Sequence, residues 1–349
     1  MIAKFGIKKN EKVSIILDNS PEFVFSSYAI IKTGAIEVPI NTAHKKHVLE
    51  HQLNQSESKV IIVGENYFDE INTIYNNLLN APYIVVVGNP KDDELPYLPF
   101  EELMHYDSEP INNHNHYSDV QSIMFTSGTT GPSKGIMMTH KHSLAFAWQW
   151  MKAVDFRPED RIYTCLPLFH TIAHRFGVIA AMLMGTEVSI VKKFSASGFW
   201  DDVRYFNATI GHVIFAMIPI LLNKPETELD KKHNLRAVYI GPSALSEQFE
   251  KRFGAKVIEA YGATENGLVT NFSNAPFRPG SCGKPDENFE VKIVDNLDRE
   301  VPAGKIGEII VRAKEPYTMF QGYYKMPEET LETLRNLWFH TGDLGYQDK

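Results

Sequence analysis

Residues 13–40, VSIILDNSPEFVFSSYAIIKTGAIEVPI, decide the fold class. Their first six residues form a short apolar run bounded by polar residues, which predicts a buried strand. Ser20 can cap a helix and Pro21 suits the first helical position, whereas Gly34 is typical of a helix end. Residues 36–40, IEVPI, then predict a second strand. The stretch therefore predicts one strand–helix–strand unit.

The same alternation continues along the chain. Further strands are predicted near 59–64, 83–88, 120–126, 161–166, 187–192, 209–215, 236–241 and 256–261, with helical stretches such as 67–79 between most of them. Repeated strand-then-helix units with β-branched strands indicate parallel sheets covered by helices. On the helical stretch after residue 140, Phe146, Trp148 and Trp150 are predicted to be core residues.

Past residue 285 the pattern changes to FEVKIVDN and EIIVRA around a polar turn, which predicts a β-hairpin. We therefore predict an α/β fold with two helix-covered, mainly parallel sheets and a small β-rich subdomain. The expected units are residues 1–150 with a phosphate loop, 151–284 with the adenine and acyl pocket, and 285–349 as the β-rich subdomain.

Composition limits the function classes. The 349 residues carry a net charge of −8, from 35 basic and 43 acidic side chains, which disfavours electrostatic binding of nucleic acid. The two cysteines, Cys165 and Cys282, fit a reducing cytosol without disulfides. The longest apolar run, 213–222, is shorter than the roughly 20 residues that span a bilayer. We expect a cytoplasmic protein without nucleic-acid partners or integral membrane contact.

The strongest chemical signal is MFTSGTTGPSKG, residues 124–135. Glycines let backbone N–H groups converge on an anion, hydroxyl side chains add donors, and Lys134 supplies a positive charge. A polar hairpin turn needs neither this length nor the lysine, so we favour a phosphate cradle. The nucleoside-triphosphatase loop is excluded because Ser133, not glycine, precedes Lys134.

Four blocks occur in one order along the chain. They are TSGTTGPSKG (126–135), YGATE (261–265), GEIIV (307–311) with GYY (322–324), and WFHTGD (338–343). Together they resemble the signature blocks of the adenylate-forming, or AMP-binding, superfamily of acyl-CoA synthetases, luciferases and peptide-synthetase adenylation domains. The resemblance covers essentially the whole chain and implies the fold of the large N-terminal domain of an acyl-CoA synthetase.

The resemblance also implies roles. The phosphate loop would hold the β- and γ-phosphates of ATP through Thr126, Ser127, Gly128, Thr129, Thr130, Gly131 and Lys134. Tyr261 would stack on adenine, in a nucleotide site that also includes Gly241, Pro242 and Gly262. Thr264 would donate to the α-phosphate, Glu265 would ligate Mg²⁺, and Asp343 would accept hydrogen bonds from the ribose. Lys134, Thr264 and Glu265 are the expected catalytic residues.

The acid substrate is assigned to His170, Phe215, Gly262 and Gly267 by the same resemblance. Taken alone, Tyr261 could be a strand-end tyrosine, His170 a structural histidine, and Glu265 and Asp343 surface acids. Two positions depart from the family pattern. Pro242 stands where a second glycine is usual, and Ser133 stands where proline usually precedes the lysine.

The implied reaction is AMP-forming ligation of a carboxylic acid to coenzyme A, with ATP and Mg²⁺. Residues 193–203, KFSASGFWDDV, resemble the carnitine/crotonobetaine-CoA ligase group, so a carnitine-like acid is the first expectation. A quaternary ammonium would need aromatic faces such as those of Phe215 and Phe169. A medium-chain fatty acid is the second expectation.

Other functions are left open. They are a nucleotide- and acyl-binding domain with little catalysis, an adenylation domain that loads a carrier protein, and a phosphotransferase. The sequence has no counterpart of the family's C-terminal lid domain, so we expect weak or absent ligase activity from this chain alone. A homodimer is a further open expectation.

Overall fold

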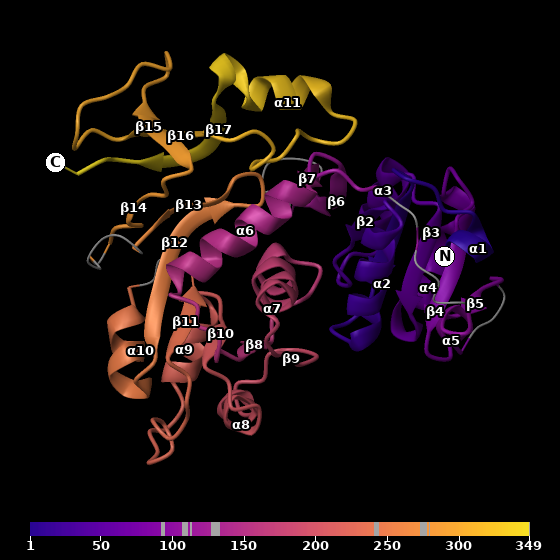
Figure 1. Ribbon diagram of the computed structural model, residues 1–349, viewed down its shortest axis with the longest axis horizontal. Helices are drawn as coiled ribbons and strands as arrows, with labels where there is room; N and C mark the ends of the chain where they lie inside the picture. Colours follow the sequence, from indigo (N-terminus) through magenta and orange to yellow (C-terminus); the bar gives the residue numbers. More distant parts are fainter. Residues whose placement is uncertain are drawn as a thin grey trace.

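The computed structural model describes residues 1–91, 95–106, 111, 114–126, 133–240, 244–272, 278 and 280–348 (Figure 1). Within these residues it has two seven-stranded sheets and one three-stranded sheet. The two large sheets are mainly parallel and carry helices, and the small sheet is antiparallel. The predicted fold class is therefore confirmed.

The first sheet has the order β5-β4-β3-β1-β2-β6-β7. Its strands are β1 (Lys12–Ile16), β2 (Ile36–Pro39), β3 (Val60–Gly64), β4 (Tyr83–Val87), β5 (Leu98–Pro99), β6 (Val120–Phe125) and β7 (Gly135–Thr139). Neighbouring strands run parallel, except that β7 pairs antiparallel with β6. The helices of this region are α1 (Ile2–Phe5), α2 (Pro21–Lys32), α3 (Lys46–Ser56), α4 (Phe68–Ile74) and α5 (Phe100–Leu103).

The first strand–helix–strand unit forms as its sequence predicts. The Ser20 side chain accepts a hydrogen bond from the backbone N–H of Phe23 at 3.3 Å, which caps α2 at its first turn. Gly34 has a φ of +75°, a left-handed conformation that glycine adopts without strain. β1 and β2 then pair in parallel.

Alternate residues of the first sheet face two different cores. Ile61 and Val63 pack on the face that α3 and α4 cover. Val60 and Ile62 point the other way, into a core shared with α2 and with the second sheet. This alternation is the period-2 pattern of strands that are buried on both faces.

The second sheet has the order β14-β13-β12-β11-β10-β8-β9. Its strands are β8 (Ile162–Thr164), β9 (Val188–Ile190), β10 (Ile210–His212), β11 (Ala237–Ile240), β12 (Lys256–Ala263), β13 (Gly267–Asn271) and β14 (Lys284–Pro285). The associated helices are α6 (His140–Ala153), α7 (Ala180–Met184), α8 (Phe199–Tyr205), α9 (Met217–Leu222) and α10 (Ser246–Phe253). A π-helix, Ile172–Ile179, leads directly into α7. The antiparallel pairs β12–β13 and β13–β14 were not predicted.

The third sheet contains β15 (Phe289–Val294), β16 (Gly307–Ala313) and β17 (Phe339–Gly345), all antiparallel. Helix α11 (Pro327–Thr333) lies between β16 and β17 in sequence. Phe289, Val311 and Phe339 pack into the same core as Trp150 of α6. In Figure 1 this sheet and α11 lie above α6 and the ends of β12 and β13.

One of the core predictions on α6 is wrong. Phe146 and Trp150 are buried, but Trp148 is 55% exposed. The reason is helical geometry, because residues four apart share a face whereas a residue two positions away points to the opposite side. Within the described residues, no helix has the length and apolar character needed to cross a bilayer.

Candidate active site

The two ends of the phosphate loop are held together by hydrogen bonds. Thr126 follows β6 and Lys134 precedes β7. The N–H of Thr126 donates to the carbonyl of Lys134 at 3.1 Å, and the N–H of Lys134 approaches the Thr126 hydroxyl at 3.4 Å. The other loop residues assigned to phosphate, namely Ser127, Gly128, Thr129, Thr130 and Gly131, lie outside the described residues, as do Gly241 and Pro242.

The base of this loop is also supported from α3. The Ser133 hydroxyl donates to the carbonyl of Thr126, and the buried Gln52 amide donates to the Ser133 hydroxyl at 3.1 Å. The Gln52 carbonyl oxygen in turn pairs with His44 Nδ1 at 3.0 Å. Ser133, which departs from the family pattern, thus has a structural partner that the sequence did not reveal.

Lys134 faces an aromatic ring that comes from a distant segment. Residues 321–324 run alongside β7, where Tyr324 N–H donates to Gly135 O at 2.7 Å and Met137 N–H donates to Gly322 O at 3.0 Å. This pairing places the Tyr323 ring 4.7 Å from Lys134 Nζ, within range of a cation–π interaction. The Tyr323 hydroxyl then donates to Glu265 Oε1 at 3.1 Å. Tyr323 therefore connects two of the expected catalytic residues.

Glu265 is half-buried in the turn between β12 and β13. Its backbone carbonyl accepts a hydrogen bond from Phe320 N–H at 2.8 Å, which fixes the turn against the segment that carries Tyr323. Burial raises the pKa of Glu265 and the Asp343 carboxylate adds to this, whereas Tyr323 and Lys134 act in the opposite direction. The carboxylate therefore sits in a site where a further positive charge would favour its ionised form.

Tyr261 and Asp343 are in direct contact, although they lie 82 positions apart in the sequence. The Tyr261 hydroxyl donates to Asp343 Oδ2 at 2.7 Å. Tyr261 is half-buried on β12, and Asp343 is exposed on β17. Burial raises the pKa of Tyr261 and Asp343 raises it further, so the phenol stays protonated as the donor. The structure thus brings the expected adenine and ribose residues together.

Gly262 and Gly267 lie at a register shift between β12 and β13, where the two backbones approach closely. A Cβ on Gly262 would be 1.8 Å from the Gly267 carbonyl oxygen. Gly267 has a φ of +73°, and a Cβ there would be 2.4 Å from Gln149 Oε1. Both glycines therefore have a backbone reason for their identity. Their predicted contact with the acid stays a prediction.

Thr264 is half-buried in this same turn, one residue before Glu265. The turn is closed by Asn266, whose side-chain oxygen accepts the N–H of Ala263 at 2.7 Å. Thr264 thus lies beside the site residues that the structure brings together, and its role toward the α-phosphate stays a prediction.

The two side chains assigned to the acid mouth are exposed. His170 lies in the turn between β8 and the π-helix, and its Nδ1 accepts the N–H of Ile172 at 3.3 Å. Phe215 lies between β10 and α9 and is 66% exposed. Among the described residues, these two side chains make no ring contact with each other or with the nucleotide residues. Their assignment to the acid stays a prediction.

A buried ionic cluster connects the π-helix to the strand that precedes the phosphate loop. The Arg175 guanidinium donates to Glu37 Oε1 on β2 at 3.1 Å and to the Ser122 hydroxyl on β6 at 2.7 Å. Arg175 and Glu37 are both fully buried. The sequence analysis assigned no role to either residue.

His174 completes this buried cluster. Arg175 Nη1 donates to His174 Nδ1, so the imidazole Nε2–H donates to Ser27 Oγ at 3.1 Å and Ser27 donates to Glu37 Oε2 at 2.5 Å. This donor order needs a neutral imidazole, because a proton on Nδ1 would face the guanidinium. Burial lowers the pKa of His174 to about 4; the Glu37 carboxylate opposes this shift and the Arg175 charge adds to it.

The fold and the site contacts together define a class of protein. The chain belongs to the AMP-binding enzyme family, whose model matches residues 1–324. The resemblance found in the sequence blocks is thereby confirmed.

Within this family the chain is similar to acid–CoA ligases. It is 34% identical over 360 residues to crotonobetaine/carnitine–CoA ligase of Salmonella typhi, and the match covers 99% of this chain and 68% of the relative. The ligase of the same name from Salmonella typhimurium is 34% identical over 361 residues, with the same shares of both chains covered.

Solved structures give the same class. The anthranilate CoA ligase AuaEII in complex with anthranoyl-AMP matches with a TM-score of 0.90 and 28% identity, over 99% of this chain and 68% of that one. The inhibitor-bound N-terminal domain of FACL13 from Mycobacterium tuberculosis matches with a TM-score of 0.87 and 28% identity, over 100% of this chain and 86% of that domain.

Tyr323 is a site residue that the sequence analysis missed. It lies in the block GYY, residues 322–324, which was quoted for the resemblance but given no function. A signal was therefore available, namely a tyrosine in a family block beside a predicted phosphate site. Its contacts with Lys134 and Glu265 required the three-dimensional pairing of residues 321–324 with β7.

Proposed function

We propose that this chain provides the nucleotide and acid sites of an AMP-forming acid–CoA ligase. One observation carries the proposal. Lys134, Tyr323 and Glu265 form a continuous chain of contacts, and Tyr261 meets Asp343 beside it, although these residues come from four separate segments. These contacts gather a cation, a half-buried carboxylate, and an exposed carboxylate beside a phenol. Such groups can together bind a nucleoside triphosphate.

The first step joins the acid to the nucleotide. An oxygen of the substrate carboxylate attacks the α-phosphorus of ATP, and the bond to the bridging oxygen of pyrophosphate breaks. Thr264 donates to the α-phosphate, while Lys134 and the loop N–H groups compensate the charge on the departing pyrophosphate. Tyr261 and Asp343 hold the adenosine, so the reacting atoms stay aligned.

The second step transfers the acyl group. The sulfur of coenzyme A attacks the carbonyl carbon of the acyl-adenylate, AMP leaves with the bonding electrons, and the thiol proton passes to solvent. Neither step forms a covalent bond to the protein. The protein therefore acts by alignment and charge compensation.

Mg²⁺ fits the donor set through Glu265. A hard dication prefers oxygen ligands and is usually held by one or two carboxylates together with substrate phosphates. Among the described residues, no group of three or more histidine, cysteine, aspartate or glutamate side chains could form a metal cage. Glu265 has a pKa raised by burial, so a bound cation would stabilise its ionised form. The ion would supply charge neutralisation at the phosphates.

We propose a carnitine-like acid as the first substrate class and a medium-chain fatty acid as the second. Support comes from the Salmonella ligases, whose names state crotonobetaine and carnitine. The exposed Phe215 ring adds an aromatic face of the kind that quaternary ammonium groups favour.

The deciding experiment is ATP–pyrophosphate exchange with a panel of carboxylic acids, followed by identification of the released nucleotide. A ligase gives acid-dependent exchange and AMP. Release of ADP would instead indicate a phosphotransferase. Exchange at background level, together with measurable AMP binding, would favour a nucleotide- and acyl-binding domain. Thioester formation on a carrier protein but not on coenzyme A would favour a carrier-loading domain.

A further inference from the structure

The block Thr-Gly-Asp, residues 341–343, forms a bulge in strand β17. The ladder between β16 and β17 pairs Glu308 with Leu344. After a register shift it continues with Ile310 opposite His340. Between these two pairs, a single residue of β16 therefore faces the three residues of the block. Bulges leave backbone groups without ladder partners and are used to redirect side chains next to active sites.

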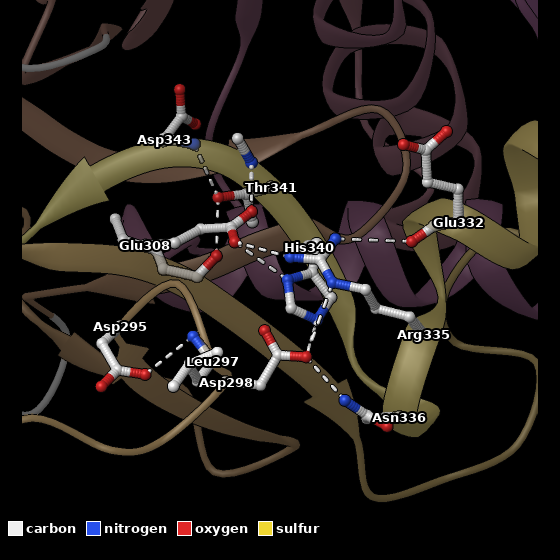
Figure 2. Close-up of polar contacts among 12 residues, drawn as sticks. Asp295, Leu297, Asp298, Glu308, Glu332, Arg335, Asn336, His340, Thr341 and Asp343 are labelled. Atoms are coloured by element: carbon white, nitrogen blue, oxygen red, sulfur yellow. Dashed lines mark hydrogen bonds and ion pairs between the residues drawn. The ribbon is translucent and has the colours of Figure 1, made fainter.

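The carboxylate of Glu308 fills the space beside this bulge (Figure 2). Its Oε1 accepts the backbone N–H of Gly342 at 3.1 Å, and its Oε2 pairs with His340 Nδ1 at 2.9 Å. Gly342 has a φ of +75°, so the chain turns sharply just before Asp343. Glu308 thus supplies the hydrogen-bond acceptor that the bulged ladder does not.

The next N–H of the bulge is also held by a side chain. Thr341 Oγ1 accepts the backbone N–H of Asp343 at 3.1 Å and donates to the Ile309 carbonyl at 2.7 Å. With both N–H groups held, the direction of the Asp343 side chain is set by the bulge. That side chain meets the Tyr261 hydroxyl.

Glu308 is itself held by a set of alternating charges, which Figure 2 shows together. Arg335 Nη2 lies 3.2 Å from Glu308 Oε2, and Arg335 Nε lies 3.5 Å from Asp298 Oδ2. Burial opposes ionisation of Glu308. The hydrogen bonds from His340 and Gly342 and the charge of Arg335 nevertheless hold the pKa of Glu308 below its usual range. The acceptor is therefore an anion at neutral pH.

We infer that Glu308 is a positioning residue for nucleotide binding, which holds the Gly342 turn so that the Asp343 carboxylate faces the ribose hydroxyls. The inference rests on the proposed function of Asp343 and adds a role for the block GEIIV, residues 307–311. Glu308 itself contacts the Gly342 backbone and not the nucleotide. Its loss should therefore change which sugar is accepted, beyond any general loss of binding.

The experiment is calorimetric titration of the full chain with AMP and with 2′-deoxy-AMP. The unmodified protein should prefer AMP by about tenfold, a difference of about 1.4 kcal/mol, because the deoxy sugar lacks one hydrogen-bonded hydroxyl. Glu308→Ala should reduce this preference to less than about threefold. Glu308→Gln retains an oxygen for the Gly342 N–H and should keep the preference close to that of the unmodified protein.

Two further variants complete the test. Glu308→Asp keeps the charge but withdraws the carboxylate by one methylene, so it should lose most of the preference even if Glu308→Ala does not fold. Glu290→Ala is the matched control, because Glu290 belongs to the same sheet and pairs with Arg312 away from the bulge. It should leave the preference unchanged.

The outcomes separate the two proposals. If the unmodified protein binds the two nucleotides equally, the ribose assignment of Asp343 fails. If the unmodified protein discriminates and both Glu308→Ala and Glu308→Asp discriminate equally well, only the positioning role of Glu308 is overturned. An Asp343→Ala, Glu308→Ala double variant should discriminate no less than Asp343→Ala alone, because the two residues act through the same contact.

Discussion

Two ionic clusters of similar composition occupy very different surroundings. The cluster of Glu37, His174 and Arg175 lies between the first sheet and the π-helix, and both ends of its Glu37–Arg175 pair are 0% exposed. The cluster of Glu308, Arg335 and their partners lies on the third sheet, where Glu308 is 22% and Arg335 43% exposed. Each pairs a glutamate with an arginine and a histidine. Their depth decides what each can contribute.

A buried charge needs an opposite charge and hydrogen bonds from the protein, because water cannot replace a lost contact. The deep cluster therefore fixes how the π-helix sits against the strand that leads into the phosphate loop. In the shallow cluster, solvent screens the charges and limits their effect on stability to about 1 kcal/mol or less. Its contribution is the direction of a neighbouring backbone turn. The same residue types thus hold two units together in one region and aim a side chain in the other.

The largest effect is expected for Arg175→Ala. It leaves the Glu37 carboxylate buried without its cation, which should lower the free energy of unfolding by about 3–5 kcal/mol. Urea denaturation measures this change. The double variant Glu37→Met, Arg175→Leu should recover most of the loss because no unpaired charge remains. A loss below about 1 kcal/mol for Arg175→Ala would remove the contrast between the clusters.

The next effect concerns how the free energy of unfolding depends on pH through the protonation of His174. Its pKa is about 4 in the folded protein and 6.5 in the unfolded chain, so between these values the unfolded state binds the extra proton. The free energy of unfolding should therefore fall as the pH is lowered through this window. The largest contribution of this residue is about 1.4 kcal/mol per pH unit.

His174→Gln should remove that contribution, as urea titrations between about pH 5 and 7 would show. Other buried histidines are present in both proteins, so the difference isolates His174. The depressed pKa of Glu308 acts below its ordinary value of 4.5 and adds no slope in this window. Identical slopes for the variant and the unmodified protein would show that His174 is not held neutral.

Lys134 is half-buried and faces the Tyr323 ring. Lys134→Ala should weaken ATP binding by about 1.5–3 kcal/mol, which is roughly tenfold to over a hundredfold, because we propose that Lys134 pairs with the β- or γ-phosphate. AMP lacks these phosphates and should bind almost as before. Calorimetry with both nucleotides tests this, and an equal loss for the two would place the lysine away from the phosphates.

The smallest effect is expected for Arg335→Ala. The guanidinium is partly exposed and pairs with Glu308 and Asp298, so its loss should change the free energy of unfolding by less than about 1 kcal/mol. Raising the salt concentration should reduce even this difference. A loss as large as that of Arg175→Ala would mean that exposure does not separate the clusters.

Much of the fold was predictable because its signals are local. These signals are the helix cap at Ser20, the helix end at Gly34 and the apolar runs on either side. Each depends only on residues a few positions away in the sequence. Glu37 shows the limit of such signals, because it sits inside the apolar strand β2 and its partner is 138 positions away. A single charge in a strand-like run does not reveal which side chain will neutralise it.

The candidate site likewise combines residues that the local sequence indicated with contacts that depend on long-range pairing. Tyr261, Glu265 and Asp343 were found because they belong to family-like blocks, and the structure brings them together with Lys134. Tyr323 also stands in such a block, but its contacts depend on the long-range pairing of residues 321–324 with β7, which the block does not reveal. The roles of the site residues stay predictions until nucleotide binding is measured.

The pairing of residues 321–324 with β7 also has a consequence for the synthesis of the chain. β7 is the outer strand of the first sheet, and its free edge is covered by residues 321–324 through backbone hydrogen bonds. A strand edge without such cover is a template for association with other chains. On the ribosome, synthesis of the intervening residues leaves this edge open for roughly ten to forty seconds. The nascent chain is therefore expected to be more prone to self-association through this edge before Tyr324 emerges than after it.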